Sequence, residues 1–359
     1  MPRPSRHVEI DQALLSHVAA HPRDLVATVA REIGVSRQTV ATRARALVAD
    51  RRLARSGSTR PFYSLGPRRE LTRVYSLAGL AEDEVWRTDV MPLLEGVAAN
   101  VSDICHYGLT EMVNNAIDHS DGQRLWLQVE VDEDDVALLV RDNGMGIFRK
   151  IARHLDLPDE RLALLELAKG KLTTDPVRHT GEGVFFTSRV FDAFAIFSGG
   201  LEFNHLDGDP EDWLLDLDRA AEGTSVLMAI SRTSQRTLRD VFERFSSGPD
   251  EYNFERTMVP VRLARIGEEN LISRSQAKRL LQRVDRFRRV VLDFAGVELI
   301  GQGFADEVFR VFVNAHPEVA LSAVNAVPAV HAMIVRAGGR VLADPFDDQD
   351  RQFTLEFPE

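Results

Sequence analysis

Apolar residues recur at helical spacing in three runs within the first fifty residues of the chain. These runs cover about 8–21, 24–34 and 36–50, and Pro22 and Gly34 separate them. Proline ends a helix because it lacks a backbone N–H, and glycine suits a tight turn between two helices. The pattern therefore predicts three short helices joined by tight turns.

Two strand-like segments follow the third run and flank a polar tip. The segments lie at 51–55 and 61–65 and the tip at 56–60, so the pattern predicts a hairpin that forms a wing. The outward face of the third predicted helix is polar and basic, which suits contact with base edges and phosphates. Its side chains are Arg37, Gln38, Thr39, Thr42, Arg43 and Arg45.

A further helix with one apolar stripe is predicted at 108–120. The stripe consists of Leu109, Met112, Val113 and Ala116. Glu111 and Asn115 are four residues apart, so both side chains project from one face of this helix. A carboxylate and an amide at this spacing are able to position a water molecule and a Mg²⁺ ion. Taken alone the pair is weak evidence, because Glu and Asn at helical spacing usually lie on a solvated helix surface.

A predicted hairpin comes next and ends in a glycine turn. Its strands lie at 125–130 and 136–140, and Asp142 follows the second strand directly. A carboxylate delivered from a strand end is able to accept a hydrogen bond from an exocyclic amine. Gly144 and Gly146 would let the backbone approach a flat base closely.

Two later segments also carry chemistry. Gly181 and Gly183 open a predicted helix, where unpaired N–H groups and the positive end of the helix dipole favour phosphates. Residues 223–226, which read Gly-Thr-Ser-Val, begin another predicted strand.

These segments, in this order, resemble the GHKL superfamily of ATPases and kinases over about residues 88–232. EMVNNAIDHS is similar to the N box of that family, and DNGMGI to its first glycine box. HTGEGVFF is similar to its phosphate-binding glycine box, and GTSV to its late Gly-Thr strand. The resemblance implies an α/β sandwich with a mixed sheet that binds ATP and Mg²⁺.

The resemblance also implies roles for single residues. Asp142 would receive the adenine amino group, and Thr224 would support the adenine site through a water molecule. Asn115 would be the protein ligand of Mg²⁺, and Glu111 would polarise the attacking water as the catalytic residue. Gly144 and Gly146 would shape the base pocket.

The phosphate end of the implied site includes a lid. Gly181, Gly183 and Val184 would hold the phosphates through their backbone amides, and residues 148–180 would form the lid. Three cations of this lid are candidates to neutralise phosphate, although a surface role is open for each: Lys169, Lys171 and Arg178. For His119 and His179, which adjoin the boxes, we favour capping or packing roles.

Net charge divides unevenly along the chain. Residues 1–66 contain eleven Lys and Arg and five Asp and Glu, hence +6, which leaves −17 for the rest of a chain whose net charge is −11. This asymmetry confines a polyanion-binding surface to the N-terminus. VAREIGVSRQTVATRARALVADRRL, within 29–63, resembles winged helix-turn-helix regulators. A winged helix used for protein contacts is the alternative.

The C-terminal third alternates strands and helices and so predicts an α/β domain. VVLDFAGVELIGQGFADEVFRVF, within 251–359, resembles STAS-like domains related to anti-sigma-factor antagonists. In those antagonists a GHKL kinase phosphorylates a serine of the strand-to-helix loop. Here the loop at 300–304 reads Ile-Gly-Gln-Gly-Phe and has no hydroxyl. A glycine turn needed for the fold and a loop that docks a partner remain equally open.

Length and composition fit a modular protein. A chain of 359 residues suits two or three domains, and its hydrophobic and charged fractions of 44% and 28% are those of a folded protein. With no run of eighteen apolar residues and no secretory start, we expect a cytoplasmic protein without a membrane segment. The single cysteine, Cys105, is expected to be a core residue.

We therefore expect an α/β multidomain chain with five parts. Residues 1–66 would be a winged helix-turn-helix DNA-binding domain, and 67–100 a helical connector. Residues 101–232 would be the GHKL ATPase domain, 233–250 a linker, and 251–359 the STAS-like domain.

Two functions from different classes fit this layout. The leading hypothesis is an ATP-binding, slowly hydrolysing transcription regulator whose nucleotide state controls the binding of DNA or of a partner. Its partners would be double-stranded DNA through residues 1–66, and ATP; a protein partner of the STAS-like domain and a homodimer are left open. The alternative is a GHKL protein kinase, specific for serine or histidine, that acts on a separate protein. A phosphorelay kinase is disfavoured because about forty residues separate the wing from the N box, too few for a histidine-bearing helix pair.

Overall fold

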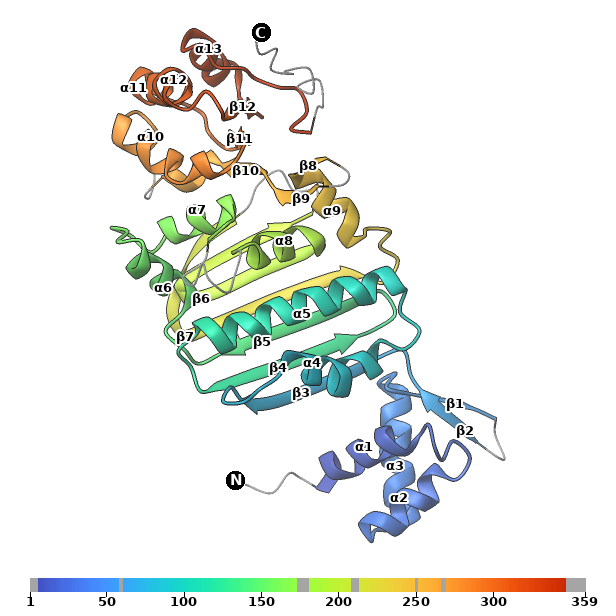
Figure 1. The fold of residues 1–359 in the computed structure, drawn as a ribbon. Helices are drawn as coiled ribbons and strands as arrows, with labels where there is room; N and C mark the ends of the chain where they lie inside the picture. The colour runs from blue at the N-terminus through green and yellow to red at the C-terminus, as the bar shows by residue number, and fades with distance from the viewer. Residues whose placement is uncertain are drawn as a thin grey trace.

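The computed structural model is an α/β structure with three regions along its length (Figure 1). A small helical unit lies at the N-terminal end, a large sheet in the middle, and a smaller sheet with helices at the C-terminal end. The structure describes residues 6–57, 61–172, 181–207, 213–248, 251–265 and 269–346. Within these ranges, no helix combines the length and the apolar composition that a membrane span requires.

The N-terminal unit contains three helices and a hairpin, as the apolar pattern predicts. They are α1 (Arg6–His17), α2 (Leu25–Ile33), α3 (Arg37–Ala49), β1 (Leu53–Ser56) and β2 (Phe62–Leu65). Gly34 ends α2 with a φ of 70°, which favours glycine, and Ser36 caps α3 by accepting from the Thr39 N–H at 3.1 Å. The unit has a hydrophobic cluster of its own. Residues 58–60 of the expected tip lie outside the described residues.

The middle region is built on a sheet with the strand order β3-β4-β5-β7-β6. Its strands are β3 (Arg69–Ser76), β4 (Arg124–Val131), β5 (Asp135–Asp142), β6 (Ala193–Leu206) and β7 (Trp213–Ser231). All four pairings are antiparallel, which corrects the expectation of a mixed sheet. The reason is that β6 and β7 form a hairpin and β7 enters between β5 and β6, opposite in direction to both.

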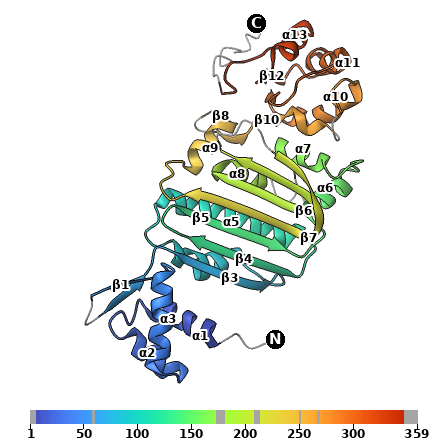
Figure 2. The same ribbon diagram turned by 180° about the vertical axis from the view of Figure 1, so that it is seen from behind.

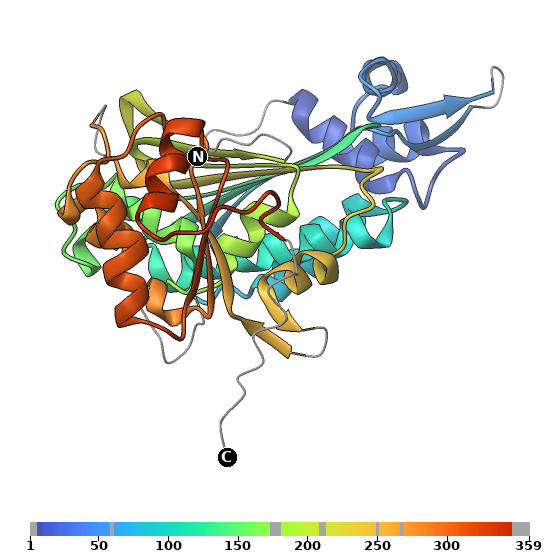
Figure 3. The ribbon, with the colours of Figure 1, turned by 90° about the horizontal axis from the view of Figure 1, so that it is seen from above.

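Helices cover one face of this sheet. They are α4 (Glu82–Val85), α5 (Ala99–His119), α6 (Ile147–His154), α7 (Leu162–Lys169) and α8 (Gly183–Val190). Seen from behind, the strands lie in front and α5 and α8 lie beyond them (Figure 2). From above, the sheet is nearly edge-on, with the cyan helix α5 on one side of it (Figure 3). The apolar stripe of α5 packs on the alternating buried residues of β4 and β5.

Two stretches expected to join domains contain strands. The expected helical connector at 67–100 contains β3, an edge strand of the sheet, as well as α4. The expected linker at 233–250 contains α9 (Leu238–Phe245) and β8 (Ser246–Gly248), which pairs with β9 (Glu251–Phe254). These segments therefore belong to the packed body of the protein.

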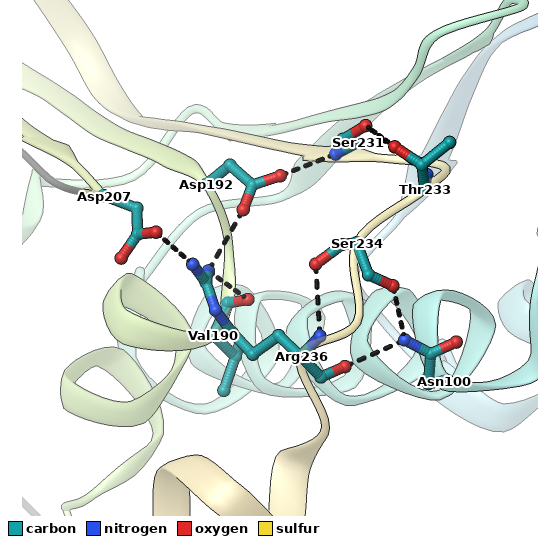
Figure 4. A network of polar contacts seen from close by, with 8 residues as sticks. All are labelled: Asn100, Val190, Asp192, Asp207, Ser231, Thr233, Ser234 and Arg236. Carbon is teal, nitrogen blue, oxygen red and sulfur yellow. Dashed lines mark hydrogen bonds and ion pairs between the residues drawn. The ribbon is translucent and has the colours of Figure 1, made fainter.

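The chain leaves the sheet through a fixed polar junction (Figure 4). The Arg236 guanidinium donates to the carbonyl oxygen of Val190 at 3.0 Å and pairs with Asp192 at 3.2 Å and with Asp207. The Asn100 amide donates to the carbonyl oxygens of Ser234 and Arg236 at 2.8 and 2.9 Å. Because these contacts reach α5, the end of α8 and the residues on either side of β6, the start of α9 is held against the middle region.

The C-terminal region has a parallel sheet with the strand order β10-β11-β12. Its elements are β10 (Arg256–Pro260), α10 (Arg274–Leu281), β11 (Arg289–Asp293), α11 (Gln302–Asp306), α12 (Val313–Ala315), β12 (Ala320–Val324) and α13 (Pro328–Arg336). A capping box between Ser273 and Gln276 fixes the start of α10. The buried side chains of this region join those of the middle sheet in one continuous hydrophobic core.

Candidate functional site

A cavity of about 280 Å³ lies between α5, the end of β5, α6, α7 and the start of α8. Eight of the residues to which the family resemblance gives a binding or catalytic role line this cavity: Glu111, Asn115, Asp142, Gly146, Gly181, Gly183, Val184 and Thr224. The segments that supply them are spread over more than a hundred residues of chain. Folding therefore brings all four sequence motifs to one space.

One face of α5 forms a wall of the cavity. Glu111, Asn115 and His119 lie four residues apart along it, and all three line the space. The Asn115 amide nitrogen is buried and has no hydrogen-bond partner among the described residues. Burial of an unpaired amide is unfavourable, so this side chain is suited to a polar group of a ligand.

Asp142 is buried at the end of β5, with 6% of its surface exposed. Its Oδ1 accepts from the Gly144 N–H at 2.7 Å and from the Thr224 N–H at 3.3 Å. Burial raises the pKa of Asp142, and the two backbone N–H groups partly offset this rise. The Thr224 hydroxyl accepts from the Ile147 N–H at 2.9 Å, which ties β7 to the start of α6.

The two glycines after Asp142 meet different demands. Gly146 has a φ of 94° and lines the cavity, and a Cβ there would lie 2.7 Å from the Ser198 hydroxyl. Gly144 does not line the cavity, and a Cβ there would lie 2.0 Å from the Ser120 carbonyl oxygen. Gly144 therefore allows the turn to pack on the end of α5 rather than to approach a ligand.

Glu111 lies against the first residue of α8. A Cβ on Gly183 would lie 1.9 Å from Glu111 Oε2, so any other residue here would displace this carboxylate from the start of α8. Burial raises the pKa of Tyr107, and the carboxylates of Glu111 and Glu182 add to this rise. The cavity thus has an acidic side next to the N-terminus of α8.

The segment between α7 and α8 is described at its two ends. The Leu172 N–H donates to the Gly181 carbonyl oxygen at 3.0 Å, and both residues line the cavity. Residues 173–180, which include the candidates Arg178 and His179, lie outside the described residues.

The other two cations proposed for the lid point elsewhere. The Lys171 ammonium donates to the Arg286 carbonyl oxygen at 3.1 Å and is not among the lining side chains. Lys169 is buried and bonds Glu166 at 2.6 Å. Both therefore contact the C-terminal region or its interface instead of the cavity.

Sequence reasoning missed Lys150 and the apolar wall. Lys150 lines the cavity, and its ammonium donates to Asp121 at 2.8 Å. The signal was its place one helical turn after Gly146, on the face that also carries Ile147 and Ile151. The apolar wall comprises Met112, Val140, Ile147, Ile151, Leu167, Leu172, Phe185, Ile196 and Val226. Such a wall suits a flat ring.

The basic face of α3 is only partly available to a ligand. Arg37, Gln38 and Thr39 are exposed at the start of α3, and Arg45 is exposed one turn from its end. Arg43 instead forms a two-pronged ion pair with Asp11 of α1, with its Nε at 2.8 Å. This pair raises the pKa of Arg43 and fixes α3 on α1.

The loop at 300–304 is shaped by close packing. The Gly301 N–H donates to the Leu271 carbonyl oxygen at 2.8 Å, and a Cβ on Gly301 would lie 2.8 Å from Ile272 Cα. The fold alone therefore requires glycine at this position.

Comparison with known families finds one match, to a STAS-like domain of unknown function (DUF4325), over residues 276–331. The C-terminal region is STAS-like. The match runs from α10 through β11, α11 and β12 into α13, and it confirms that part of the sequence prediction. A search of curated proteins finds no match for this chain.

Proposed function

We propose that this protein is an ATP-binding, slowly hydrolysing transcription regulator whose nucleotide state controls the binding of DNA or of a partner. In this proposal the middle region is a GHKL ATPase domain, and the cavity holds Mg-ATP. Residues 1–66 are a winged helix-turn-helix that binds double-stranded DNA. The STAS-like region is the part of the chain that binds the protein partner.

The observation that carries the proposal is the arrangement of the cavity. The same cavity is lined by a buried carboxylate, Asp142, by an apolar wall and by the N-terminus of α8. A flat base with an exocyclic amine fits the carboxylate and the apolar wall, and phosphates fit the helix N-terminus. The volume, about 280 Å³, is near the lower end of ligand pockets.

Mg²⁺ fits the polar side of the cavity. Mg²⁺ is usually held by one or two protein oxygens together with phosphate oxygens and water. Because the two ends of an amide have the same shape, a half-turn of the Asn115 side chain places its oxygen where the unpartnered nitrogen lies. Asn115 is therefore the residue that would hold the ion, next to the phosphates at Gly181 and Gly183.

Glu111 and Lys150 complete the proposed chemistry. Glu111 belongs to α5 and its carboxylate lies against the start of α8. A carboxylate in this position is able to orient water toward the last phosphate of ATP. Lys150 is the candidate to exchange its bond to Asp121 for the sugar or a phosphate of the nucleotide.

Asp142→Asn tests the pocket. An amide would present a mismatched donor to the adenine amine, so Mg-ATP affinity measured by calorimetry should fall about 10- to 100-fold, equivalent to ~1–3 kcal/mol. Asp135→Asn, at the exposed start of the same strand, is the matched control and should bind like wild type. Equal affinity of Asp142→Asn and wild type would contradict the assigned pocket.

Glu111→Gln separates binding from chemistry. It should retain Mg-ATP affinity and lose turnover by roughly 10²- to 10⁴-fold, because a positioned general base is removed. With γ-labelled ATP and a cell lysate, release of inorganic phosphate supports hydrolysis. Transfer of label to a protein would instead support the kinase alternative.

A further inference from the structure

One short segment links the cavity to the C-terminal region. Leu167 on α7 and Leu172 just after it line the cavity. Between them, Lys169 points away and is buried beneath the STAS-like region, with 1% of its side chain exposed. The same few residues therefore contact both the candidate ligand space and the C-terminal core.

Lys169 belongs to a buried charge cluster that spans the two regions. Its ammonium bonds Glu166 at 2.6 Å and also donates to the Gln282 and Arg279 carbonyl oxygens at 2.8 and 3.3 Å. The other oxygen of Glu166 accepts from Arg283 at 2.7 Å. Burial of the charge lowers the pKa of Lys169 to about 8, against the opposing effect of Glu166.

The backbone of the segment is held as well. The Thr257 hydroxyl on β10 donates to the Lys169 carbonyl oxygen at 2.7 Å, and Arg283 donates to the Lys171 carbonyl oxygen. Gly170 lies directly on a ring: a Cβ there would be 2.5 Å from Phe254. The segment 166–172 is thus held by side-chain donors and is also packed against an aromatic ring.

A second contact joins the start of α8 to the same region. The Phe185 ring lines the cavity and lies 5.0 Å from the Phe245 ring of α9 and 4.5 Å from the Phe254 ring of β9. Phe254 in turn lies 5.2 Å from Phe287, just before β11. The start of α8 therefore packs on β9, whose Phe254 in turn contacts the C-terminal region, while α7 and the residues after it contact that region directly.

We propose that the STAS-like region is a regulatory partner built into the chain, which sets ligand affinity in the cavity by seating the segment 166–172 through Glu166, Lys169 and Arg283. Ligand binding then changes the exposure of α10 in return. This inference rests on the proposed nucleotide-binding function of the cavity.

The physical reason is that a buried charge cluster has two states rather than a continuum. Separating Arg283 from Glu166 leaves one oxygen of the buried carboxylate and the guanidinium without their charged partner, which is strongly unfavourable at a buried interface. The segment is therefore either seated or released as a unit, and Leu167 and Leu172 move with it. Because coupling between two sites is reciprocal, whatever unseats α10 weakens the ligand, and the ligand favours the seated state.

Arg283→Met tests the coupling in the full-length protein, with Arg310→Met as the matched control. Arg310 forms an exposed ion pair with Asp306 in the same region, at 2.7 Å. Arg283→Met should weaken Mg-ATP binding about tenfold, within the usual range of allosteric coupling. It should also speed amide hydrogen exchange in 166–172, whereas Arg310→Met should leave both measurements at wild-type values.

Thr257→Val provides a second route if Arg283→Met does not fold. It removes the hydroxyl that donates to the Lys169 carbonyl oxygen and keeps the shape of the side chain. Mg-ATP binding should therefore weaken, and amide exchange in 166–172 should become faster, both by less than in Arg283→Met. A folded variant with wild-type affinity and wild-type exchange in 166–172 would overturn the inference.

The two proposals fail in distinguishable ways. Absence of Mg-ATP binding by wild type would refute the proposed function, while the exchange comparison of Arg283→Met with Arg310→Met still decides whether the STAS-like region seats 166–172. If wild type binds Mg-ATP, the nucleotide should also slow exchange in α10. Unchanged exchange there would refute the reciprocal coupling alone.

Discussion

The two ends of the protein are attached to the middle sheet in different ways. The N-terminal unit has a hydrophobic cluster of its own, and charged residues join it to the sheet. Arg51 pairs with Glu133 at 2.8 Å, with 67% and 56% of the two side chains exposed. Arg52 pairs with Glu70 at 2.9 Å. The STAS-like region instead shares one core with the sheet and buries the cluster of Glu166 at the boundary.

This difference predicts which end responds to the cavity. An exposed ion pair such as Arg51–Glu133 contributes about 0–1 kcal/mol, and the other pair, Arg52–Glu70, is only partly buried, with 17% and 35% of the two side chains exposed. These pairs hold the N-terminal unit less firmly than a shared core holds the STAS-like region. Breaking a buried ion pair costs about 3–5 kcal/mol, and here the broken pair lies beside the cavity. In the proposed regulator, nucleotide binding is therefore communicated mainly to the STAS-like region, while the DNA-binding unit follows as a tethered module.

The largest expected effect is on the free energy of unfolding, when the acidic residue of an ion pair between the middle region and one of the two end regions is replaced. Glu166→Ala leaves Lys169 and Arg283 as buried, unpaired cations and should lower the free energy of unfolding by about 3–5 kcal/mol. Glu133→Ala removes the exposed partner of Arg51 and should lower it by about 0–1 kcal/mol. Urea denaturation of both variants measures the contrast, and equal decreases would remove the distinction between the two interfaces.

A smaller effect concerns pH, because the C-terminal interface contains a lysine whose pKa is lowered to about 8. A free lysine has a pKa of about 10.4, so between these values the unfolded chain binds more protons than the folded protein. This group therefore makes the protein more stable as pH rises from about 8, by roughly 1 kcal/mol per pH unit.

Lys169→Met should remove that dependence. The free energy of unfolding of wild type, minus that of Lys169→Met, should increase between pH 8 and pH 9. The same difference for Arg51→Met, at the N-terminal interface, should stay constant, since arginine does not titrate in this range. A flat difference for both variants would contradict a lowered pKa of Lys169.

The sequence predicts the elements better where contacts are local. The three N-terminal helices and the hairpin follow from apolar spacing and from Gly34 and Ser36, and the structure has them. The match to a STAS-like family confirms the prediction for the C-terminal region. The structure also gathers the motif residues around one cavity, while their binding of ATP stays a prediction.

Distant contacts are beyond the reach of the sequence pattern. Lys169 donates to the carbonyl oxygens of Arg279 and Gln282, more than a hundred residues away along the chain. Glu166 pairs with Arg283 over a similar separation, and no periodicity in the sequence reports such contacts. Lys169 and Lys171 are close in sequence to the phosphate-binding glycine box, which makes them candidates to contact phosphate. In the structure neither side chain lines the cavity, whereas Lys150 does. The fold of the chain, rather than residue type, decides which cations reach the cavity.

Glycines are ambiguous markers of where an element ends. The sequence pattern predicts that the N box helix starts near Gly108, yet this residue lies inside α5, which begins at Ala99. A Cβ at Gly108 would lie 2.4 Å from the Phe191 ring, so glycine is needed there for close packing on the residues before β6. A glycine occurs in a sequence both where a helix begins and where two elements pack closely. Only the tertiary contact shows which of the two reasons applies.

The smallest expected effect tests whether the N-terminal unit is separable. Replacing Arg37 and Arg45 with alanine should weaken duplex DNA binding modestly and reduce the slope of log affinity against log salt by about 0.9 for each phosphate that is no longer neutralised. Unfolding free energy and Mg-ATP affinity should stay at wild-type values, because both side chains are exposed on α3 and lie outside the cavity. Arg43→Ala is the contrasting variant. It leaves Asp11, 14% exposed, without its guanidinium and should destabilise the unit itself, by about 1–3 kcal/mol. If the double variant kept wild-type DNA affinity and salt slope, the N-terminal unit would be a protein-binding module. If the Mg-ATP affinity of the double variant fell, both end regions of the protein would be coupled to the cavity.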